Sequence, residues 1–263
     1  MANAQETALK PYDPPLFRTV SGAEPPALPE GTTVRLVADS NFAPFSFLSN
    51  SGALAGLSVE LAFAACEQAK LRCSIEARPY GEIMEALSRG EADGVIAGPR
   101  LDEANLAVAR MTRPYFRIMA RFAVKRGAEI LSADSQGLSG RRIAVVKDTV
   151  HANWLAASYG GSEIVPFDDW AAAGAALKAG EVDALFGDNL AVIYWVTGET
   201  SASCCELLDS AFSDFDSFSR NLAFLVRRDR PDLRAAFDYG LDMAQASGAT
   251  SRIIRTYVPL NPW

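Results

Sequence analysis

A single histidine, His151, is present among the 263 residues. This excludes metal sites built from several histidines, and any Ser-His-Asp triad would have to use His151 itself. The G-x-S-x-G, Walker A and dinucleotide-binding patterns are all absent. The longest apolar candidate, Ala184 to Val196, contains Asp188 and Asn189 and falls short of the roughly 18 apolar residues of a membrane helix. These absences argue against most enzyme classes and against a membrane span.

Clusters of basic residues are also lacking. The chain carries 25 basic and 32 acidic side chains, a net charge of -7, and the basic residues are scattered. Nucleic acid and anionic membranes are therefore poor candidate partners. With 49% hydrophobic and 22% charged residues the composition is globular, and the length favours two lobes of roughly 100 residues or more each.

Short apolar strands alternate with helical runs, and the alternation occurs twice. This is the pattern of βαβ units, so we expect two α/β lobes. The residues before 33 are rich in proline, with little periodicity, and predict an extended arm. The expected organisation is an arm (1–32), a first lobe (33–117), a second lobe (118–217) and a return to the first lobe (218–263). A two-stranded hinge would join the lobes.

A twelve-residue repeat marks one place in each half of the chain. Residues 87–98 (LSRGEADGVIAG) match residues 177–188 (LKAGEVDALFGD). In each copy a glycine, Gly90 or Gly180, can take the left-handed conformation that ends a helix, and a buried parallel strand follows. Ligands bind outside the carboxyl ends of such strands. Residues 98–100 and Asp188 would therefore form opposing walls of a cleft if the lobes face each other.

The four cysteines form two close pairs. Cys66 ends a predicted helix and Cys73 opens a strand, so a tight turn could bring the two sulfur atoms together, which favours an oxidising compartment. The alternative is two small buried side chains. For the adjacent Cys204 and Cys205 a disulfide would close a strained small ring, so two unbonded side chains are favoured and the question stays open.

The first residues include Ala2-Asn3-Ala4, the small-x-small pattern left by a signal peptidase, with no apolar segment before it. We expect a secreted protein whose signal peptide has been removed; a cytosolic protein with an alanine-rich start is the alternative.

Six motifs in order, over about Val34 to Tyr257, resemble the family 3 extracellular solute-binding proteins, the polar-amino-acid-type receptors of bacterial ABC importers. The resemblance implies a two-lobed periplasmic binding protein fold of type II, in which each lobe is a mixed, mostly parallel sheet flanked by helices. It further implies a periplasmic monomer that closes by hinge bending, has a membrane permease as partner and needs no cofactor or metal. The motifs are residues 38–45 (ADSNFAPF), 56–62 (GLSVELA), the Cys66 to Cys73 spacing, 113–115 (RPY), 138–145 (LSGRRIAV) and 182–188 (VDALFGD).

The resemblance also implies site residues in the first lobe. Aromatic rings at Phe42 and Tyr80 would sandwich the ligand, and Gly98 lies at a strand end. Where members that bind α-amino acids place an arginine for the carboxylate, this chain has Asn105, and Arg100 could supply a replacement cation. Phe42 could instead be a core aromatic, and Arg100 a solvated charge.

In the second lobe, the resemblance implies that Asp188 receives an amino group. The family's Gly-Thr-Thr helix start is replaced by residues 147–150 (KDTV), where Lys147 and the helix N-terminus around Thr149 could hold an anion. Asp188 could instead cap the helix that begins near Leu190, and Lys147 could be a surface charge. Trp154 has the helical spacing of a core residue. The predicted ligand-binding residues are Phe42, Tyr80, Gly98, Arg100, Asn105, Lys147, Thr149 and Asp188.

The predicted function is capture of a small charged ligand, an amino acid derivative such as an opine or a related carboxylate, for an ABC importer. One alternative is a receptor for a planar aromatic polycarboxylate such as pyrroloquinoline quinone. The other is a dehydratase of the cyclohexadienyl type on the same scaffold, in which Asp188 or Glu103 with a raised pKa protonates a leaving hydroxyl. We favour a binding protein over an enzyme.

Overall fold

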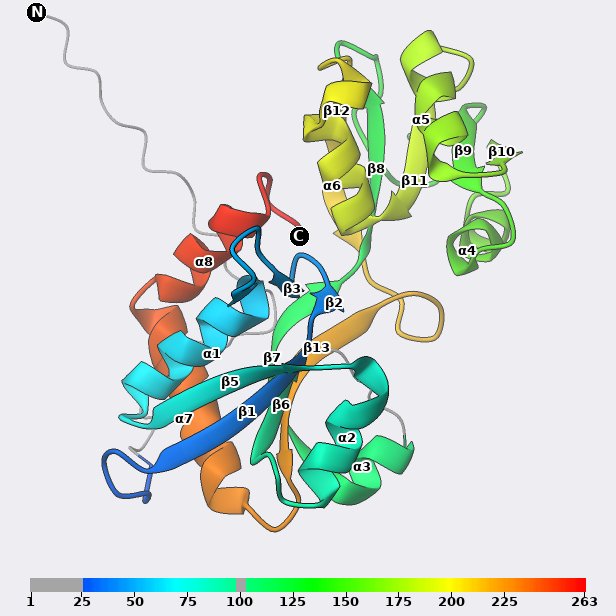
Figure 1. The fold of residues 1–263 in the computed structure, drawn as a ribbon. Coiled ribbons are helices and arrows are strands. Elements are labelled where there is room, and N and C mark those ends of the chain that lie inside the picture. Colours follow the sequence, from blue (N-terminus) through cyan, green and yellow to red (C-terminus); the bar gives the residue numbers. More distant parts are fainter. Residues whose placement is uncertain (1–25, 98–102) are drawn as a thin grey trace, which may run out of the picture. The chain divides into compact units, whose positions relative to one another are not determined.

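The structure, a computed structural model, describes residues 26–97 and 103–263 (Figure 1). Residues 1–25 of the predicted arm (1–32) lie outside the described residues, as do the predicted site residues Gly98 and Arg100. The chain divides into two compact units: unit 1 holds the residues up to Tyr115 and Ala223–Tyr257, and unit 2 holds Phe116–Leu222 and Val258–Trp263. No helix in the described ranges is long and apolar enough to cross a membrane.

Unit 1 is built on a five-stranded sheet of order β5-β1-β6-β13-β7. β1 is parallel to β5 and β6, and β13 is antiparallel to β6. All four residues of β6 are buried, as expected for an apolar run inside a sheet. The strands are β1 (Thr33–Asp39), β5 (Arg72–Arg78), β6 (Gly94–Ala97), β7 (Ala109–Ile118) and β13 (Arg220–Arg227), with a small sheet of β2 (Asn41–Phe42), β3 (Ser46–Leu48) and β4 (Leu54–Ala55).

The described part of unit 1 has five helices: α1 (Leu57–Gln68), α2 (Tyr80–Ser88), α3 (Glu103–Val108), α7 (Pro231–Ala246) and α8 (Ala249–Tyr257). α1 lies against α7, and their close approach requires Gly240, because a Cβ there would stand 2.2 Å from the carbonyl oxygen of Ala65. Leu233, Phe237 and Leu241 of α7 are buried, as their spacing predicts. Figure 1 shows α2 and α3 together, away from α1 and α7.

Unit 2 has a second five-stranded sheet, of order β10-β9-β11-β8-β12. β9 is parallel to β10 and β11, whereas β8 is antiparallel to β11 and β12, so this mixed sheet has as many antiparallel as parallel pairs. Leu155 of α4 packs on one face of the sheet, and α5 and α6 pack on the other. The elements are β8 (Ala120–Lys125), β9 (Arg142–Val146), α4 (Val150–Ser158), β10 (Glu163–Phe167), α5 (Trp170–Ala179), β11 (Ala184–Asp188), α6 (Asn189–Thr197), a short 3-10 helix (Glu199–Ser201) and β12 (Cys205–Phe212).

The sequence repeat forms the same side-chain clamp in both units. In unit 1 the Asp93 carboxylate accepts from the backbone N of Arg35 at 2.9 Å, and the guanidinium of Arg35 donates to Gly90 O at 2.8 Å. In unit 2 the Asp183 carboxylate accepts from the backbone N of Arg142 at 2.8 Å. The Arg142 guanidinium donates to Gly180 O at 3.2 Å. Both glycines have positive φ, 71° and 83°, which confirms the predicted helix ends.

The C-terminal hexapeptide, Val258–Trp263, packs on unit 2, whereas the sequence assigned it to the first lobe. Buried Arg121 donates to Asn261 O at 2.6 Å, and buried Asn189 donates to Pro262 O at 3.0 Å. The rings of Phe116 and Trp263 are 4.8 Å apart. A third segment therefore connects the units, besides the two expected from β7 and β13. The hexapeptide is held by the buried side-chain donors of Arg121 and Asn189, which need hydrogen-bond acceptors. The periodicity of residues along the sequence does not reveal that these donors need partners.

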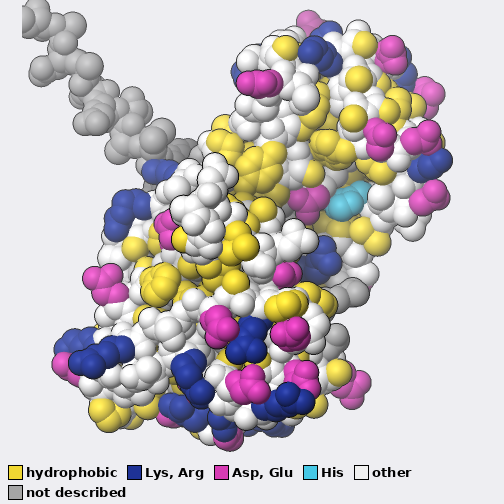
Figure 2. All heavy atoms as spheres, in the orientation of Figure 1, with side chains coloured by type: hydrophobic (Ala, Val, Ile, Leu, Met, Phe, Trp, Pro, Cys, Tyr) yellow, Lys and Arg dark blue, Asp and Glu magenta, His cyan; other side chains and the backbone are white. Residues whose placement is uncertain are grey.

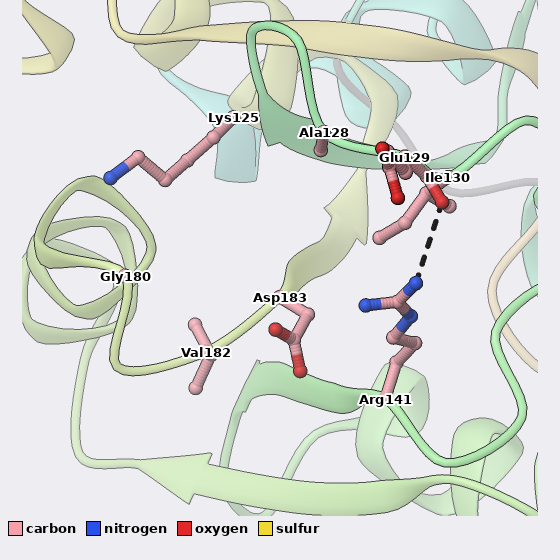
Figure 3. A pocket seen from close by; sticks show the side chains of 8 residues that line it. All are labelled: Lys125, Ala128, Glu129, Ile130, Arg141, Gly180, Val182 and Asp183. Carbon is pink, nitrogen blue, oxygen red and sulfur yellow. Dashed lines mark hydrogen bonds between the residues drawn. The ribbon is translucent and has the colours of Figure 1, made fainter.

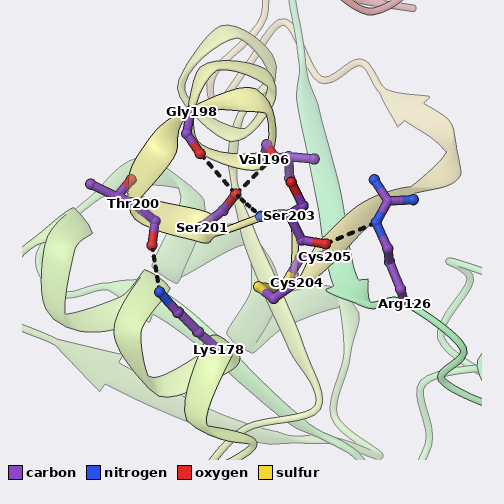
Figure 4. The surroundings of a disulfide bond; sticks show 9 residues. All are labelled: Arg126, Lys178, Val196, Gly198, Thr200, Ser201, Ser203, Cys204 and Cys205. Carbon is purple, nitrogen blue, oxygen red and sulfur yellow. Dashed lines mark hydrogen bonds between the residues drawn. A yellow bond between two sulfur atoms is a disulfide. The ribbon is translucent and has the colours of Figure 1, made fainter.

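Both cysteine pairs are disulfide-bonded, so the chain has no free thiol. The bond between Cys66 and Cys73 ties the end of α1 to β5, which confirms the prediction. The bond between Cys204 and Cys205 was not expected (Figure 4). It follows a tight turn in which Ala202 and Ser203 both have positive φ and the Ser201 hydroxyl donates to Val196 O and Gly198 O.

Candidate ligand-binding site

Two of the predicted aromatic residues lie at one edge of the unit 1 sheet. β1 and β5 are parallel, with Asp39 opposite Arg78. Phe42 and Tyr80 follow these strand ends closely. Phe42 is half-buried and stacks on Phe45, with ring centroids 5.0 Å apart. Tyr80 is the first residue of α2 and is 52% exposed, so its ring offers an open apolar surface.

The other predicted residues of this edge follow β6. Gly98 and Arg100 are outside the described residues, so their roles stay predictions. Asn105 lies in α3, a short helix with no buried residue.

Lys147 and Thr149 lie at the corresponding edge of unit 2, after β9. Lys147 Nζ is 2.6 Å from a carboxylate oxygen of Asp168, which follows the neighbouring β10, so its charge already has a partner. Thr149 is the N-cap of α4: its hydroxyl accepts from Ala152 N at 3.2 Å and donates to Val146 O at 2.7 Å. Lys147 therefore has a carboxylate partner and Thr149 caps a helix, and their roles in ligand binding stay predictions.

Asp188 ends β11 at the same edge and caps α6, as the structural alternative predicts. Its Oδ1 accepts from Leu190 N at 2.9 Å and from Ala191 N at 3.2 Å. Burial raises the pKa of this carboxyl, against the lowering effect of the two backbone hydrogen bonds and of the nearby His151 and Arg220. Its Oδ2 accepts no hydrogen bond from the described part of the chain. A half-buried acid with one unused oxygen suits an incoming ammonium group.

An aromatic cluster that the sequence reasoning missed borders Asp188. His151, in the first turn of α4, stacks on Phe218 with ring centroids 5.1 Å apart and contacts the edge of Phe186 at 5.9 Å. Trp154 stacks on Phe186 at 5.2 Å and packs against the core, as its spacing predicts. Burial lowers the pKa of His151. The only available signal was the i, i+3 spacing of His151 and Trp154, and nothing local in the sequence links it to Phe218.

A pocket of about 310 Å³ lies at the opposite end of the unit 2 sheet (Figure 3). Arg141 precedes β9, and Val182 and Asp183 precede β11, so the pocket is at the amino ends of these parallel strands. Arg141 donates there to Glu129 O at 3.4 Å. The pocket contains no residue that the sequence predicted for binding.

Charge on the visible surface is mixed. Figure 2 shows basic side chains lying among acidic ones.

The chain forms two mixed α/β units, joined by strands that run from one unit into the other, and polar side chains lie at the carboxyl ends of the parallel strands. This arrangement defines a two-lobed periplasmic binding protein fold of type II. The sequence pattern of the bacterial extracellular solute-binding proteins, family 3, matches residues 34–259. The chain belongs to this family, which confirms the resemblance.

Curated relatives are similar over most of their length. The L-arginine-binding protein of Pseudomonas aeruginosa is 23% identical over 226 residues, which cover 85% of this chain and 87% of the relative. ABC transporter arginine-binding protein 1 of Escherichia coli strain K12 is 23% identical over 220 residues, covering 84% and 88%. The histidine-binding periplasmic protein of Salmonella typhimurium is 21% identical over 226 residues, covering 85% and 86%.

Solved structures show the same fold. The L-cystine solute receptor of Neisseria gonorrhoeae in its unliganded open conformation has a TM-score of 0.73 at 19% identity, covering 88% of this chain and 94% of that one. Substrate binding domain 2 of Lactococcus lactis GlnP in its open conformation has a TM-score of 0.71 at 21% identity, covering 89% and 98%. At these identities the likeness shows the fold alone.

Proposed function

We propose that this solute-binding protein captures an amino acid, or a derivative that retains a free ammonium group, in the periplasm and delivers it to the membrane permease of an ABC importer. Asp188 carries the proposal, because its carboxylate is half-buried at a ligand-binding strand edge and keeps one oxygen unbonded within the described residues. The arginine- and histidine-binding names of the relatives support the same ligand class.

Each unit by itself offers further groups to the proposed ligand. The exposed ring of Tyr80 and the half-buried ring of Phe42 offer apolar or cation–π surfaces. The first backbone N–H groups of α4, which Thr149 caps, offer donors to an anion. Closure of the two units on the ligand remains a prediction. An unchanged radius of gyration in small-angle scattering at saturating ligand would argue against it.

A thermal-shift screen tests the proposed function. The probes are the twenty proteinogenic L-amino acids, L-cystine, octopine, putrescine and pyrroloquinoline quinone. A ligand at about 100 times its dissociation constant adds roughly 2.7 kcal/mol to the stability of the folded state. Stabilisation by an amino acid or octopine supports the proposal. Stabilisation by pyrroloquinoline quinone alone favours the polycarboxylate receptor, which the named relatives do not favour.

One observation favours a second candidate, the dehydratase. Burial raises the pKa of Asp188, as a general acid requires. However, Oδ1 of Asp188 is occupied by two backbone donors, and the named relatives are binding proteins. Incubation with prephenate or arogenate distinguishes the two functions: loss of substrate in the wild type, but not in Asp188→Asn, would establish the enzyme.

A further inference from the structure

Ring contacts gather three separate segments of unit 2 beside Asp188. Phe186 and Asp188 are two residues apart on β11, so their side chains lie on one face of the sheet. His151 contacts Phe186 and stacks on Phe218. Phe218 in turn is two residues before Arg220, the first residue of β13, and the start of this strand, up to Leu222, belongs to unit 2. The His151 ring therefore bridges the end of β11, which carries Asp188, and the start of β13, which carries Arg220.

A self-capped turn fixes Arg220 at this place. The Asp214 carboxylate accepts from Asp216 N at 3.0 Å and from Ser217 N at 3.1 Å. The backbone N groups of Phe218 and Ser219 both donate to Asp214 O, at 3.0 Å and 2.7 Å. Phe218 and Ser219 are consequently buried, and Arg220 leaves the turn exposed.

Arg220 is an uncommitted cation beside an uncommitted carboxylate oxygen. Its guanidinium forms no hydrogen bond or ion pair within the described residues. Its charge lowers the pKa of both His151 and Asp188, in agreement with the ring contacts that bring Phe218 and its neighbour segment against His151 and Phe186. Two other cations of this unit are already engaged: Lys147 pairs with Asp168, and Arg117 donates to Asn221 at 3.0 Å and lies over the Phe215 ring.

We infer that Arg220 receives the carboxylate of the ligand while Asp188 receives its ammonium group, so that unit 2 alone holds both head groups of an α-amino acid. This inference rests on the proposed function. It accounts for the absence of an arginine at position 105, because the anion is held from β13 instead. A guanidinium fork matches a carboxylate in geometry and charge, and the ligand supplies the partner that the protein does not.

The test compares each L-amino acid found in the screen with its α-carboxamide, which keeps the ammonium group and lacks the carboxylate charge. Isothermal titration gives the preference as the ratio of the two dissociation constants. In Arg220→Gln the preference for the acid should fall at least about tenfold, because the charge-assisted contact is lost. In Asp188→Asn the acid and the amide should weaken alike.

Two further variants serve as controls. Arg72→Gln removes another exposed arginine, on β5, which forms no side-chain hydrogen bond or ion pair in the described ranges, and should leave both constants unchanged. Arg220→Lys keeps the charge without the fork and should restore part of the preference, which shows that a loss in Arg220→Gln is not misfolding.

An unchanged preference in Arg220→Gln would overturn the inference and leave the proposed function intact. A collapse of the preference in Arg100→Ala, but not in Arg220→Gln, would likewise overturn it and assign the anion to unit 1. A wild type that binds no amino acid, no α-carboxamide and no octopine would refute the proposed function and the inference together.

Discussion

The two units use the same clamp at one end of the sheet and different side chains at the other. Arg35, Asp93 and Gly90 form in unit 1 the contacts that Arg142, Asp183 and Gly180 form in unit 2. At the carboxyl ends of the strands the described residues differ: unit 1 offers the aromatic rings of Phe42 and Tyr80, and unit 2 offers a half-buried acid, Asp188, near the exposed cation Arg220. The clamp, which is repeated, holds the end of a helix to the start of a strand. The carboxyl ends of the strands, which differ between the units, are where we expect the ligand to bind.

Breaking the clamps should have the largest effect, and a larger one in unit 1. The Asp93 side chain is 11% exposed and that of Asp183 is 28% exposed. Removing a more buried acid leaves its partners less well solvated, so we expect Asp93→Ala to cost about 3 kcal/mol and Asp183→Ala about 1.5 kcal/mol. Urea unfolding of the two variants measures this. Equal losses of stability in the two variants would show that the burial of the aspartate does not determine how much each clamp contributes.

Removal of a disulfide should likewise cost more stability in unit 1 than in unit 2. The Cys66–Cys73 bond closes a longer loop than the bond between adjacent Cys204 and Cys205. Loop entropy predicts that Cys66→Ser with Cys73→Ser costs on the order of 2 kcal/mol, and that the unit 2 double variant costs about 1 kcal/mol. Thermal unfolding tests the order. Mass spectrometry of a non-reduced digest tests the bonds themselves, and alkylation of Cys66 without reductant would contradict the first.

Asp188→Asn separates the two roles of the acid at the unit 2 edge. Asparagine caps a helix about as well as aspartate, so the cap survives and only the charge is lost. We expect the melting temperature to stay level or rise, because burial opposes the ionised form, and affinity to fall at least about tenfold, or 1.4 kcal/mol. Asp188→Ala should in addition lose about 1 kcal/mol of stability with the cap. Normal binding by Asp188→Asn would make the residue purely structural.

His151 should produce the smallest effect, a loss of stability in mild acid. Burial lowers the pKa of His151 below its ordinary 6.5; Arg220 lowers it further, and Asp188 opposes them. The unfolded chain therefore takes up a proton first, and stability falls as the pH drops below about 6.5 until the folded-state pKa is passed. His151→Phe keeps a ring against Phe218 and removes the titration. If melting curves of both proteins fall equally between pH 7.5 and 5.5, His151 is not responsible.

Local pattern predicted much of this fold. The repeat predicts a buried strand after each helix-ending glycine, and β6 (Gly94–Ala97) and β11 (Ala184–Asp188) follow Gly90 and Gly180 as expected. The repeat places an aspartate three residues after each helix-ending glycine, but the arginines that complete the clamps, Arg35 and Arg142, lie outside the repeat. Asp188 at a strand end, and its alternative as a cap, were both readable from the order of residues.

Contacts between distant segments could not be predicted in this way. Arg220 is far from Asp188 along the chain, and the packing of Phe218 on His151 and Phe186 brings the two segments together. The C-terminal hexapeptide is held by Arg121 and Asn189, whose burial depends on the completed sheet. The bond between Cys204 and Cys205 depends on two left-handed residues before it that are not glycines, which sequence preferences do not favour.

Since every cysteine is bonded, a cysteine introduced by mutation would be the only thiol in the molecule. A fluorophore could then be attached at a chosen position, such as Tyr80, without first removing the native cysteines. Labelling would have to be fast and carried out near neutral pH, because a new thiolate can attack a disulfide and exchange with it. Cys205 is fully buried and Cys204 only partly so, which makes the Cys204 sulfur the more accessible point of attack in that pair.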